Sequence, residues 1–550
     1  MLSFWSGKRG RDLREYLTAY LMITPAMLLI FVFGIFPVIF AVYVSLHKWK
    51  IKQGPFLGLE NYVKAIDALT YVLFFALVVG LVYFAYRRIR DCVVQAQEHN
   101  EKPWALLVPG MLNAGGILLI LRYVFLLIPE VLAIADKVRG QERSRELFLQ
   151  LLGEALRADH VVSAFWNWVC LLALALVLTL ILWRFIRTPH RVTYLNQMTV
   201  AWSCLVGAVI VGWFTYTEMV KAIHAAMETG EGNLVSVQVV LISTGVLCLG
   251  VAWKFWSKAV KHESDRAFIW RGFVALLLIV GGWLLVGEIP AVIQSGDKNV
   301  WQGLKVTVFY AAGTIPFQLS IALVLAYLLF QNVRGRDFFR VVYFLPYVTP
   351  AVASAAVFRL MFGPRASSPV NALITLLGGE HQRWLIEPRG VFTILGSYLG
   401  VEVPSWAAGP SLALVVIIIF SIWTYVGYDT VIYLAGLGNI SHEINEAAAI
   451  DGASRWQIFR YITLPLLSPT TYFLSLIAVI GTFKAFNHIY VMRDVMALGT
   501  VDTVSVAIFD EFFLRTRFGY ASAMAFVLFA IILVLTYANN KIQGSRVFYG

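Results

Sequence analysis

The stretch EAAAIDGASRWQIFRYITLP, residues 446–465, separates two apolar runs that are each long enough to cross a bilayer. Ser441 is placed to cap a helix that begins just before this stretch. The alanines at 447–449 are strong helix formers and small enough to let another surface approach closely. Gly452 can adopt the left-handed conformation that ends a helix. The first half of the stretch therefore predicts a short helix that stops at a glycine corner.

The second half of the stretch predicts another helix. Ser454 and Gln457 have the spacing of a capping box, in which each side chain satisfies a backbone N–H at the helix start. Pro465 fits the first turn of the following span, where its missing N–H is harmless. Residues 441–465 thus read as helix, corner and helix. Their polar surface is more elaborate than a connector requires, so we interpret the segment as a docking surface on the cytoplasmic side.

The composition identifies a membrane protein. Of the 550 residues, 59% are hydrophobic and 14% are charged, whereas soluble domains are nearer 45–50% apolar and about 25% charged. The net charge of +12 could suggest nucleic-acid binding, but the basic residues gather beside apolar runs, as the positive-inside bias predicts. The four cysteines show no metal-ligand spacing, and we interpret them as buried apolar side chains.

The apolar runs predict an all-α, polytopic protein with about twelve membrane spans. About 20 apolar residues cross the ~30 Å hydrocarbon layer as a helix, and strands are not expected because the runs do not alternate. The predicted spans share this length and continuity: 18–46, 68–87, 104–127, 163–183, 199–217, 236–255, 269–290, 302–330, 340–362, 408–434, 466–488 and 520–539.

Charge predicts the orientation. The basic N-terminus, GKRGRDLREY, should hold the start of the chain in the cytoplasm. The loops that follow the even-numbered spans should then also be cytoplasmic, and these loops are rich in Arg and Lys. Residues 137–160 are the exception, because five basic residues fall on the predicted outer side. Six acidic neighbours accompany them, and we expect an amphipathic helix there, which leaves the span boundaries around 120–165 open.

An internal repeat is visible in the first half. Trp183 and Trp253 lie 70 residues apart, as do Glu218 and Glu288, and a looser first copy begins near residue 86. Several markers at one offset favour a duplicated helical hairpin over chance similarity of aromatic belts. Residues 67–297 are therefore expected to form three hairpins, six spans in all.

The sequence around residues 441–465 resembles a known family. Glu446-Ala447-Ala448, then Gly452 and Ile462-x-Leu464-Pro465, resembles the EAA signature of binding-protein-dependent ABC importer permeases at the family's spacing. AYLMITPAMLLIFVFGIFPVIFAVYVSLHKW, GLENYVKAI and RGRDFFRVVYFLPYVTPAVASAAVFRLMF are similar to the early segments of the maltose-type carbohydrate permeases, and FGYASAMAFVLFAIILVL to their last span. The resemblance covers about 1–66 and 298–550.

The resemblance implies a six-span type I importer core interrupted by a six-span insert. Residues 1–66 would hold the first core span with its outer segment, 67–297 the inserted membrane region, and 298–550 the rest of the core with its coupling loop at 441–465. Both junctions would lie outside, which requires an even number of inserted spans. The protein is then expected in a bacterial cytoplasmic (inner) membrane with its N-terminus in the cytoplasm.

By the same resemblance, the loop couples this chain to a separate ATPase. The residues implied in this coupling are Glu446, Ala447, Ala448, Asp451, Gly452, Leu464 and Pro465. The implied partners are a second homologous permease, two ABC ATPase subunits, an extracytoplasmic solute-binding protein and membrane lipid. The sequence contains no G-x-x-x-x-G-K-[ST] phosphate loop, so we expect no enzyme activity and no cofactor on this chain, with ATP and Mg on the partners.

Polar residues within spans are candidates for the substrate pathway, because burying them in a membrane is costly. The candidates are Trp423, Tyr425, Tyr428, Lys484, Asn487 and His488, with Asp429 beside them. Aromatic faces and hydroxyl or amide groups suit a neutral carbohydrate, such as a di- or oligosaccharide, or a related small polar solute. Tryptophan and tyrosine could equally be interfacial anchors. The family often carries Asp where Asn487 stands and a Gly-Gly-Pro stretch soon after, which RDVMALGTVDT replaces here, so the outer gate is expected to differ.

Two other functional classes stay open from the sequence. The twelve predicted spans also suit a standalone, ion-coupled secondary transporter, which should show paired carboxylates within its spans. A membrane enzyme should show clustered His, Asp or Glu at one membrane face. Neither pattern is evident in the sequence, and the permease interpretation is therefore preferred.

Overall fold

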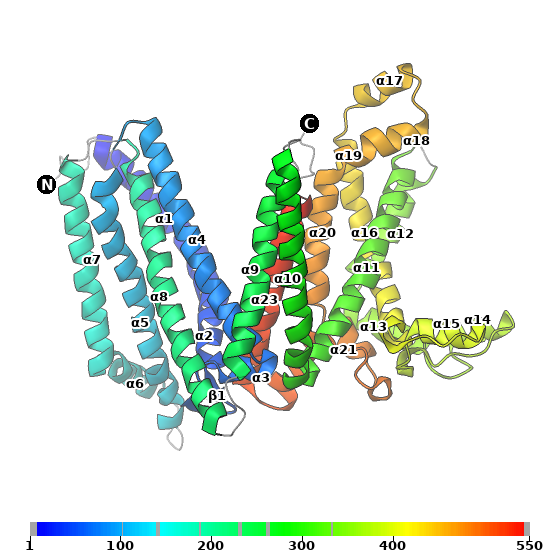
Figure 1. The fold of residues 1–550 in the computed structure, drawn as a ribbon, viewed down its shortest axis with the longest axis horizontal. Coiled ribbons are helices and arrows are strands. Elements are labelled where there is room, and N and C mark those ends of the chain that lie inside the picture. The colour runs from blue at the N-terminus through cyan, green and yellow to red at the C-terminus, as the bar shows by residue number, and fades with distance from the viewer. Residues whose placement is uncertain are drawn as a thin grey trace. The chain divides into compact units, whose positions relative to one another are not determined.

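The computed structural model is built almost entirely of helices (Figure 1), which confirms the all-α, multi-span class. The structure describes residues 8–101, 103–138, 144–185, 189–228, 234–259, 265–331 and 334–543. Some residues of the segments whose charges predict the membrane orientation, at 139–143, 186–188 and 260–264, lie outside the described residues. One departure from the all-helical expectation is a short antiparallel hairpin after the first span, β1 (His47–Trp49) and β2 (Gln53–Phe56).

Contacts divide the chain into two compact units. The first unit contains residues 1–67 and 293–550, and the second contains residues 68–292. The sequence placed these junctions at 66/67 and 297/298. At the edge of the first unit the two junctions are close together, because the Ser295 hydroxyl donates a hydrogen bond of 2.5 Å to Asp67 Oδ2. A long segment can therefore leave and re-enter the first unit at one place.

The second unit consists of long apolar helices joined by short connections. These are α4 (Leu69–Glu98), α5 (Leu107–Lys137), α7 (Asp159–Phe185), α8 (Arg191–Glu228), α9 (Leu234–Ala259) and α10 (Asp265–Ser295), the last of which ends in the first unit. The amphipathic helix expected at 137–160 is confirmed as α6 (Arg145–Arg157). Its start is capped by Ser144, whose hydroxyl accepts from the Leu147 N–H at 3.1 Å.

The first unit holds the remaining membrane-length helices. One span, Glu15–Ser45, combines α1 (Lys8–Ile30), a π-helical turn and α2 (Phe36–Ser45). The others are α11 (Lys298–Phe330), α16 (Leu412–Gly438), α23 (Phe518–Gln543) and two bent pairs. Among the described residues, ten helices are long and apolar enough to span, or up to twelve if each bent pair is one span.

Two of the predicted spans are not single straight helices. The run 340–362 is not one straight helix: α12 (Arg336–Val348) and α13 (Ala351–Met361) meet at 94°. Pro350 explains the break, because a residue before proline is pushed out of the helical region, and Thr349 has an extended backbone. The run 466–488 ends early, since α20 (Ser468–Phe483) stops before the separate helix α21 (Asn487–Met492).

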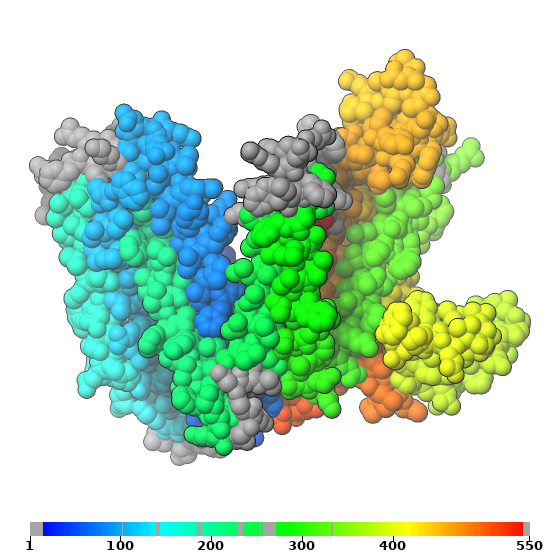
Figure 2. All heavy atoms as spheres, in the orientation of Figure 1, coloured from blue at the N-terminus to red at the C-terminus, as the bar shows by residue number. Residues whose placement is uncertain are grey.

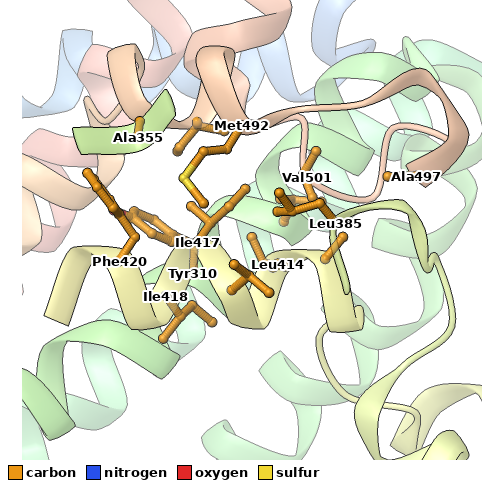
Figure 3. Close-up of a cluster of buried hydrophobic side chains, with 14 of the residues drawn as sticks. Tyr310, Ala355, Leu385, Leu414, Ile417, Ile418, Phe420, Met492, Ala497 and Val501 are labelled. Atoms are coloured by element: carbon orange, nitrogen blue, oxygen red, sulfur yellow. The ribbon is translucent and has the colours of Figure 1, made fainter. Parts of the chain in front are cut away.

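Helix α16 is the centre of the first unit. Its residues Leu414, Ile417 and Phe420 pack with Tyr310 of α11 and Met492 of α21 in a buried apolar cluster (Figure 3). Neighbouring helices can approach α16 closely because small residues of α16 face them. At Gly427, a Cβ atom would overlap the backbone carbonyl of Tyr343 in α12. These contacts join α16 to α11 and α12, which precede it in the sequence, and to α21, which follows it.

Candidate functional site

The segment between α16 and α20 forms an elbow of two short helices, α17 (His442–Ile450) and α18 (Arg455–Ile458), at one end of the first unit (Figure 1). The Ser441 hydroxyl caps α17 by accepting from the Glu443 N–H at 3.3 Å. Gly452 makes the corner with a left-handed backbone, φ +80°. This geometry agrees with the helix, corner and helix that the local residues predict.

The capping box of the second elbow helix is formed. The Ser454 N–H donates to Gln457 Oε1 at 2.7 Å, and the Gln457 N–H donates to Ser454 Oγ at 3.4 Å. A π-helical turn follows, and Pro465 occupies the first turn of α19 (Leu464–Leu466). The caps and the corner of the elbow are thus formed by residues of the elbow itself.

The elbow is exposed. Both of its helices, all of whose residues the structure describes, are without a buried side chain. Three large apolar side chains are prominent, with Ile450 86%, Trp456 67% and Tyr461 70% exposed. The Glu446 carboxylate lies 3.0 Å from His442 Nδ1 on the surface. An exposed helix that carries bulky apolar groups and a carboxylate has the chemistry of a protein-docking surface.

The residues that the sequence assigned to coupling lie in two places. Glu446, Ala447 and Ala448 are on α17, and Asp451 and Gly452 form the corner, at the exposed end of the elbow. Leu464 and Pro465 are half-buried where the elbow joins the next span. The first group is thus at the exposed end of the elbow, and the second lies at the start of the helix that leads into α20.

A cavity of about 120 Å³ lies among the helices of the first unit, between α11, α12, α16, α20 and α21. Its lining combines aromatic, hydroxyl, amide and carboxylate groups with small residues that leave space. The lining residues are Tyr310, Thr314, Gln318, Tyr347, Tyr425, Tyr428, Asp429, Ile477, Ala478, Gly481, Thr482, Ala485 and His488. They include one carboxylate and, among the residues that the structure describes, neither lysine nor arginine.

Hydrogen bonds fix the polar side of this cavity. The Gln318 side-chain N–H₂ donates to Asp429 Oδ2 at 2.6 Å, and Asp429 is only 3% exposed. The Tyr310 hydroxyl lies 2.9 Å from His488 Nε2 and 2.6 Å from the Ser421 hydroxyl. The buried Thr314 hydroxyl has no hydrogen-bond partner among the described residues, so it is available to a solute or to water.

Aromatic rings form the other side. Tyr347 of α12 stacks on Tyr428 of α16 with ring centroids 4.6 Å apart, and meets Tyr425 edge-on at 6.0 Å. The faces of such rings pack against C–H groups, while their hydroxyls remain free to exchange hydrogen bonds. The cavity therefore offers the mixture of surfaces that a polyhydroxylated, uncharged solute can use.

The structure separates the sequence-predicted pathway residues into two groups. Tyr425, Tyr428 and His488 line the cavity. Trp423 instead packs against Phe358 and Phe420, with centroids 5.1 and 6.0 Å away. Lys484 and Asn487 are exposed and are not among the lining residues of the described structure.

Sequence reasoning missed most of the lining residues, and two groups of them are instructive. Tyr310, Thr314 and Gln318 stand at i, i+4 and i+8 on α11, a spacing that places them on one face of a helix. That polar stripe within an otherwise apolar span was a signal that could have identified them. Tyr347 gave no such signal, because only the packing of α12 against α16 brings it to the cavity.

Charged side chains gather at the end of α16 opposite the elbow. Arg493 makes two hydrogen bonds to the Asp510 carboxylate, at 2.8 and 3.2 Å, and Arg359 pairs with Asp494 at 3.2 Å. Burial raises the pKa of Asp502 beside this group, which Arg493 partly offsets. These ion pairs attach the start of segment 493–503 to Asp510 and to α13. The Gly-Gly-Pro stretch that the family often carries here is absent from this segment.

Comparison with known proteins places the chain in a family. Residues 318–548 match the family described as binding-protein-dependent transport system inner membrane component. A probable ABC transporter permease of Pyrococcus horikoshii is 30% identical over 50% of this chain and 86% of the relative. A probable ABC transporter permease of Bacillus subtilis is 32% identical over 46% of this chain and 76% of the relative. The lactose transport system permease of Rhizobium radiobacter is 31% identical over 44% and 75%. The matched region contains the elbow and most of the cavity, and the chain belongs to the ABC transporter permeases, the inner membrane components of binding-protein-dependent transport systems.

Proposed function

We propose that this chain is one permease subunit of an ABC importer and forms part of the translocation pathway for an uncharged di- or oligosaccharide. The observation that carries the proposal is the cavity in the first unit, which is lined by four tyrosines, an amide, a free hydroxyl and no cationic side chain among the described residues. The name of the Rhizobium radiobacter relative, a lactose transport system permease, supports a carbohydrate.

The elbow is proposed to receive the force that drives transport. Its exposed apolar groups and the Glu446 carboxylate would dock on a separate ATPase subunit, which binds ATP and Mg. Two such ATPases, a second homologous permease and an extracytoplasmic solute-binding protein would complete the importer. In this arrangement the elbow and the N-terminus face the cytoplasm, and the charged cluster around Arg493 faces the other side.

A charge reversal on the elbow tests the coupling. The permease, its partner permease and the ATPase are co-expressed, and complex yield and solute-stimulated ATP hydrolysis are measured for Glu446→Lys. Glu443→Lys is the matched control, because it is an exposed glutamate on the same helix. We expect Glu446→Lys alone to reduce both quantities, while insertion into the membrane is unchanged. Equal behaviour of the two variants contradicts the proposed role of Glu446.

The energy source of uptake distinguishes the proposed ABC importer from an ion-coupled secondary transporter. The buried Asp429 carboxylate in the cavity is the feature that would favour it, since proton-coupled transporters carry such groups within their spans. Uptake of labelled oligosaccharide is followed in cells treated with a protonophore or depleted of ATP. The proposal expects uptake to follow ATP and to survive loss of the proton gradient while ATP is maintained. The opposite dependence identifies a secondary transporter.

The second unit is proposed to be an accessory insert that does not line the pathway. The Pyrococcus horikoshii relative aligns over 86% of its own length while covering half of this chain, so half of this chain lies outside that alignment. Replacing residues 68–292 by a short Gly/Ser linker can close the gap, because Asp67 and Ser295 are hydrogen-bonded. We expect ATP-driven uptake to persist in this variant. Complete loss of uptake by a correctly inserted and assembled protein argues for a direct role of the insert.

A further inference from the structure

Residues 390–411 leave the body of the first unit as a closed protrusion immediately before α16. Gly390 and Ser411 form an antiparallel bridge at its base. Next to the bridge, the Val391 N–H donates to the Pro410 carbonyl at 2.9 Å, and the Leu412 N–H donates to the Arg389 carbonyl at 3.1 Å. The protrusion is therefore fixed to the first residue of a membrane-length helix.

The interior of the protrusion is closely packed on its own backbone. Helix α15 (Val391–Leu399) ends at Gly400, which has φ +70°, and the chain then returns along the helix. A Cβ atom at Gly396 would lie 2.6 Å from the Val401 carbonyl oxygen. A Cβ atom at Gly409, which has φ +74°, would lie 2.6 Å from the Phe392 ring. The protrusion therefore has a defined, closely packed conformation.

Its outer face is strongly apolar and aromatic. Trp406 is 84% exposed and Leu399 is 78% exposed. The other exposed large apolar residues of the protrusion are Phe392, Leu395, Tyr398 and Val401. Between residues 391 and 411 the only charged residue is Glu402. A surface of this kind in water is costly, and one with a single charge lacks the polar rim of a typical protein–protein interface.

A second short helix, beside the protrusion, also exposes large apolar side chains. Helix α14 (Pro369–Leu376) and the residue after it expose Leu373, Leu376 and Leu377. Figure 1 shows α14 and α15 lying across the direction of α11 and α16, and Figure 2 shows them as a lobe that stands out from the neighbouring helices of this unit. Apolar helices that lie across the spans, at the level where a span begins, are positioned like interfacial helices.

A recess of about 490 Å³ adjoins the protrusion and has the chemistry of a bilayer interface. Trp301, Phe309 and Trp406 contribute aromatic rings to its lining, and Lys305 contributes an exposed ammonium group. The Lys305 ammonium lies 6.0 Å from the centroid of the Phe309 ring. Tryptophan belts and lysines that extend toward phosphate groups are typical of the depth at which headgroups meet acyl chains.

We propose that the protrusion 390–411, together with the exposed leucines of α14, is a membrane-binding surface that inserts into the phospholipid leaflet on the side opposite the elbow. Leu399 and Trp406 lie among the acyl chains near the headgroups, and Lys305 meets lipid phosphate. Because the base of the protrusion is bonded to the start of α16, this surface anchors the outer end of the central helix to the bilayer. The inference does not depend on the transported solute.

Depth-dependent quenching tests this surface in the full chain. The four native cysteines, all within residues 68–292, are replaced by alanine or serine. Single cysteines at Leu399, Trp406 or Glu402 are labelled with a small fluorophore, and the protein is placed in nanodiscs of phosphatidylcholine and phosphatidylglycerol. Trp456→Cys on the elbow is the control for an exposed aromatic position away from lipid.

Doxyl-labelled lipid is expected to quench the labels at 399 and 406 several-fold more than those at 402 and 456, and aqueous iodide is expected to show the reverse order. Leu395→Cys gives a second reading of the same face if either variant fails to fold. Strong iodide quenching with weak doxyl quenching at 395, 399 and 406 overturns the proposal. Shielding of these sites that appears only after a solute-binding protein or second permease is added also overturns it, because the occupant is then a protein.

Discussion

The left-handed corner at Gly452 allows a prediction in which only the backbone is perturbed. Gly452 has φ +80°, and a Cβ atom added there would have no atom of the described structure within 4 Å. Gly452→Ala therefore introduces no clash, and its cost is the left-handed backbone itself, about 1–2 kcal/mol for a residue with a Cβ. Asparagine tolerates this region better than alanine, so Gly452→Asn should cost less.

This strain should appear in the affinity for the ATPase. We assume that the docked elbow keeps the corner seen here and that the free elbow can relax. The binding free energy then becomes less favourable by up to about 1–2 kcal/mol. This corresponds to roughly a 5–30-fold rise in Kd, since 1.4 kcal/mol is tenfold. The affinity is measured with the partner ATPase and full-length permease in nanodiscs. The expected order of Kd is wild type, then Gly452→Asn, then Gly452→Ala.

Gly438→Ala is the matched control. Gly438 is the last residue of α16, its added Cβ also has no atom of the described structure within 4 Å, and its conformation is helical. Alanine there should favour the helix slightly and leave docking unchanged. If Gly452→Ala binds the ATPase as tightly as the wild type, the corner is not required in the docked state and the reasoning fails. Equal weakening by both variants would show that the effect is not specific to the corner.

Three further outcomes are expected. Tyr428→Ala should raise the solute concentration for half-maximal uptake roughly 2–10-fold, because about 0.5–1.5 kcal/mol of aromatic packing with the solute is lost. Lys484→Gln should leave that concentration unchanged, and equal effects of the two variants would place the solute elsewhere. Gly427→Ala should lower the midpoint of thermal unfolding, since the added Cβ overlaps a backbone carbonyl of α12 and overpacking costs about 1–3 kcal/mol; an unchanged midpoint contradicts this contact. Hydrogen bonds from Arg389 hold the pKa of Glu387 below its ordinary value of 4.5, so the pair stabilises the folded chain above that pH, and the stabilisation is lost as the pH falls through the lower folded value. Hydrogen exchange, corrected for intrinsic rate, should therefore show the base of the protrusion opening at acid pH in the wild type, and Arg389→Gln should remove this pH dependence; identical profiles would refute it.

The sequence by itself determined the features whose causes are local. Runs of about 20 apolar residues predict helices of membrane length because a helix satisfies its own backbone within lipid. The elbow could be predicted residue by residue, since the side chains of Ser441, Ser454 and Gln457 bond backbone groups within three positions of themselves. Gly452 makes the corner through its own backbone conformation. Membership in the permease family also followed from a local signature, Glu446 to Pro465.

Only the tertiary structure decided where the helices break and which faces meet. The predicted span over 340–362 is bent by 94° at Pro350, and apolar length alone does not report such a bend. The cavity depends on pairs such as Gln318 with Asp429, 111 residues apart, and Tyr310 with His488, 178 residues apart. Helical periodicity shows which residues share a face, but packing against a neighbour decides what that face contacts. For that reason Tyr428 lines the cavity, while Trp423, on the same helix, packs against Phe358.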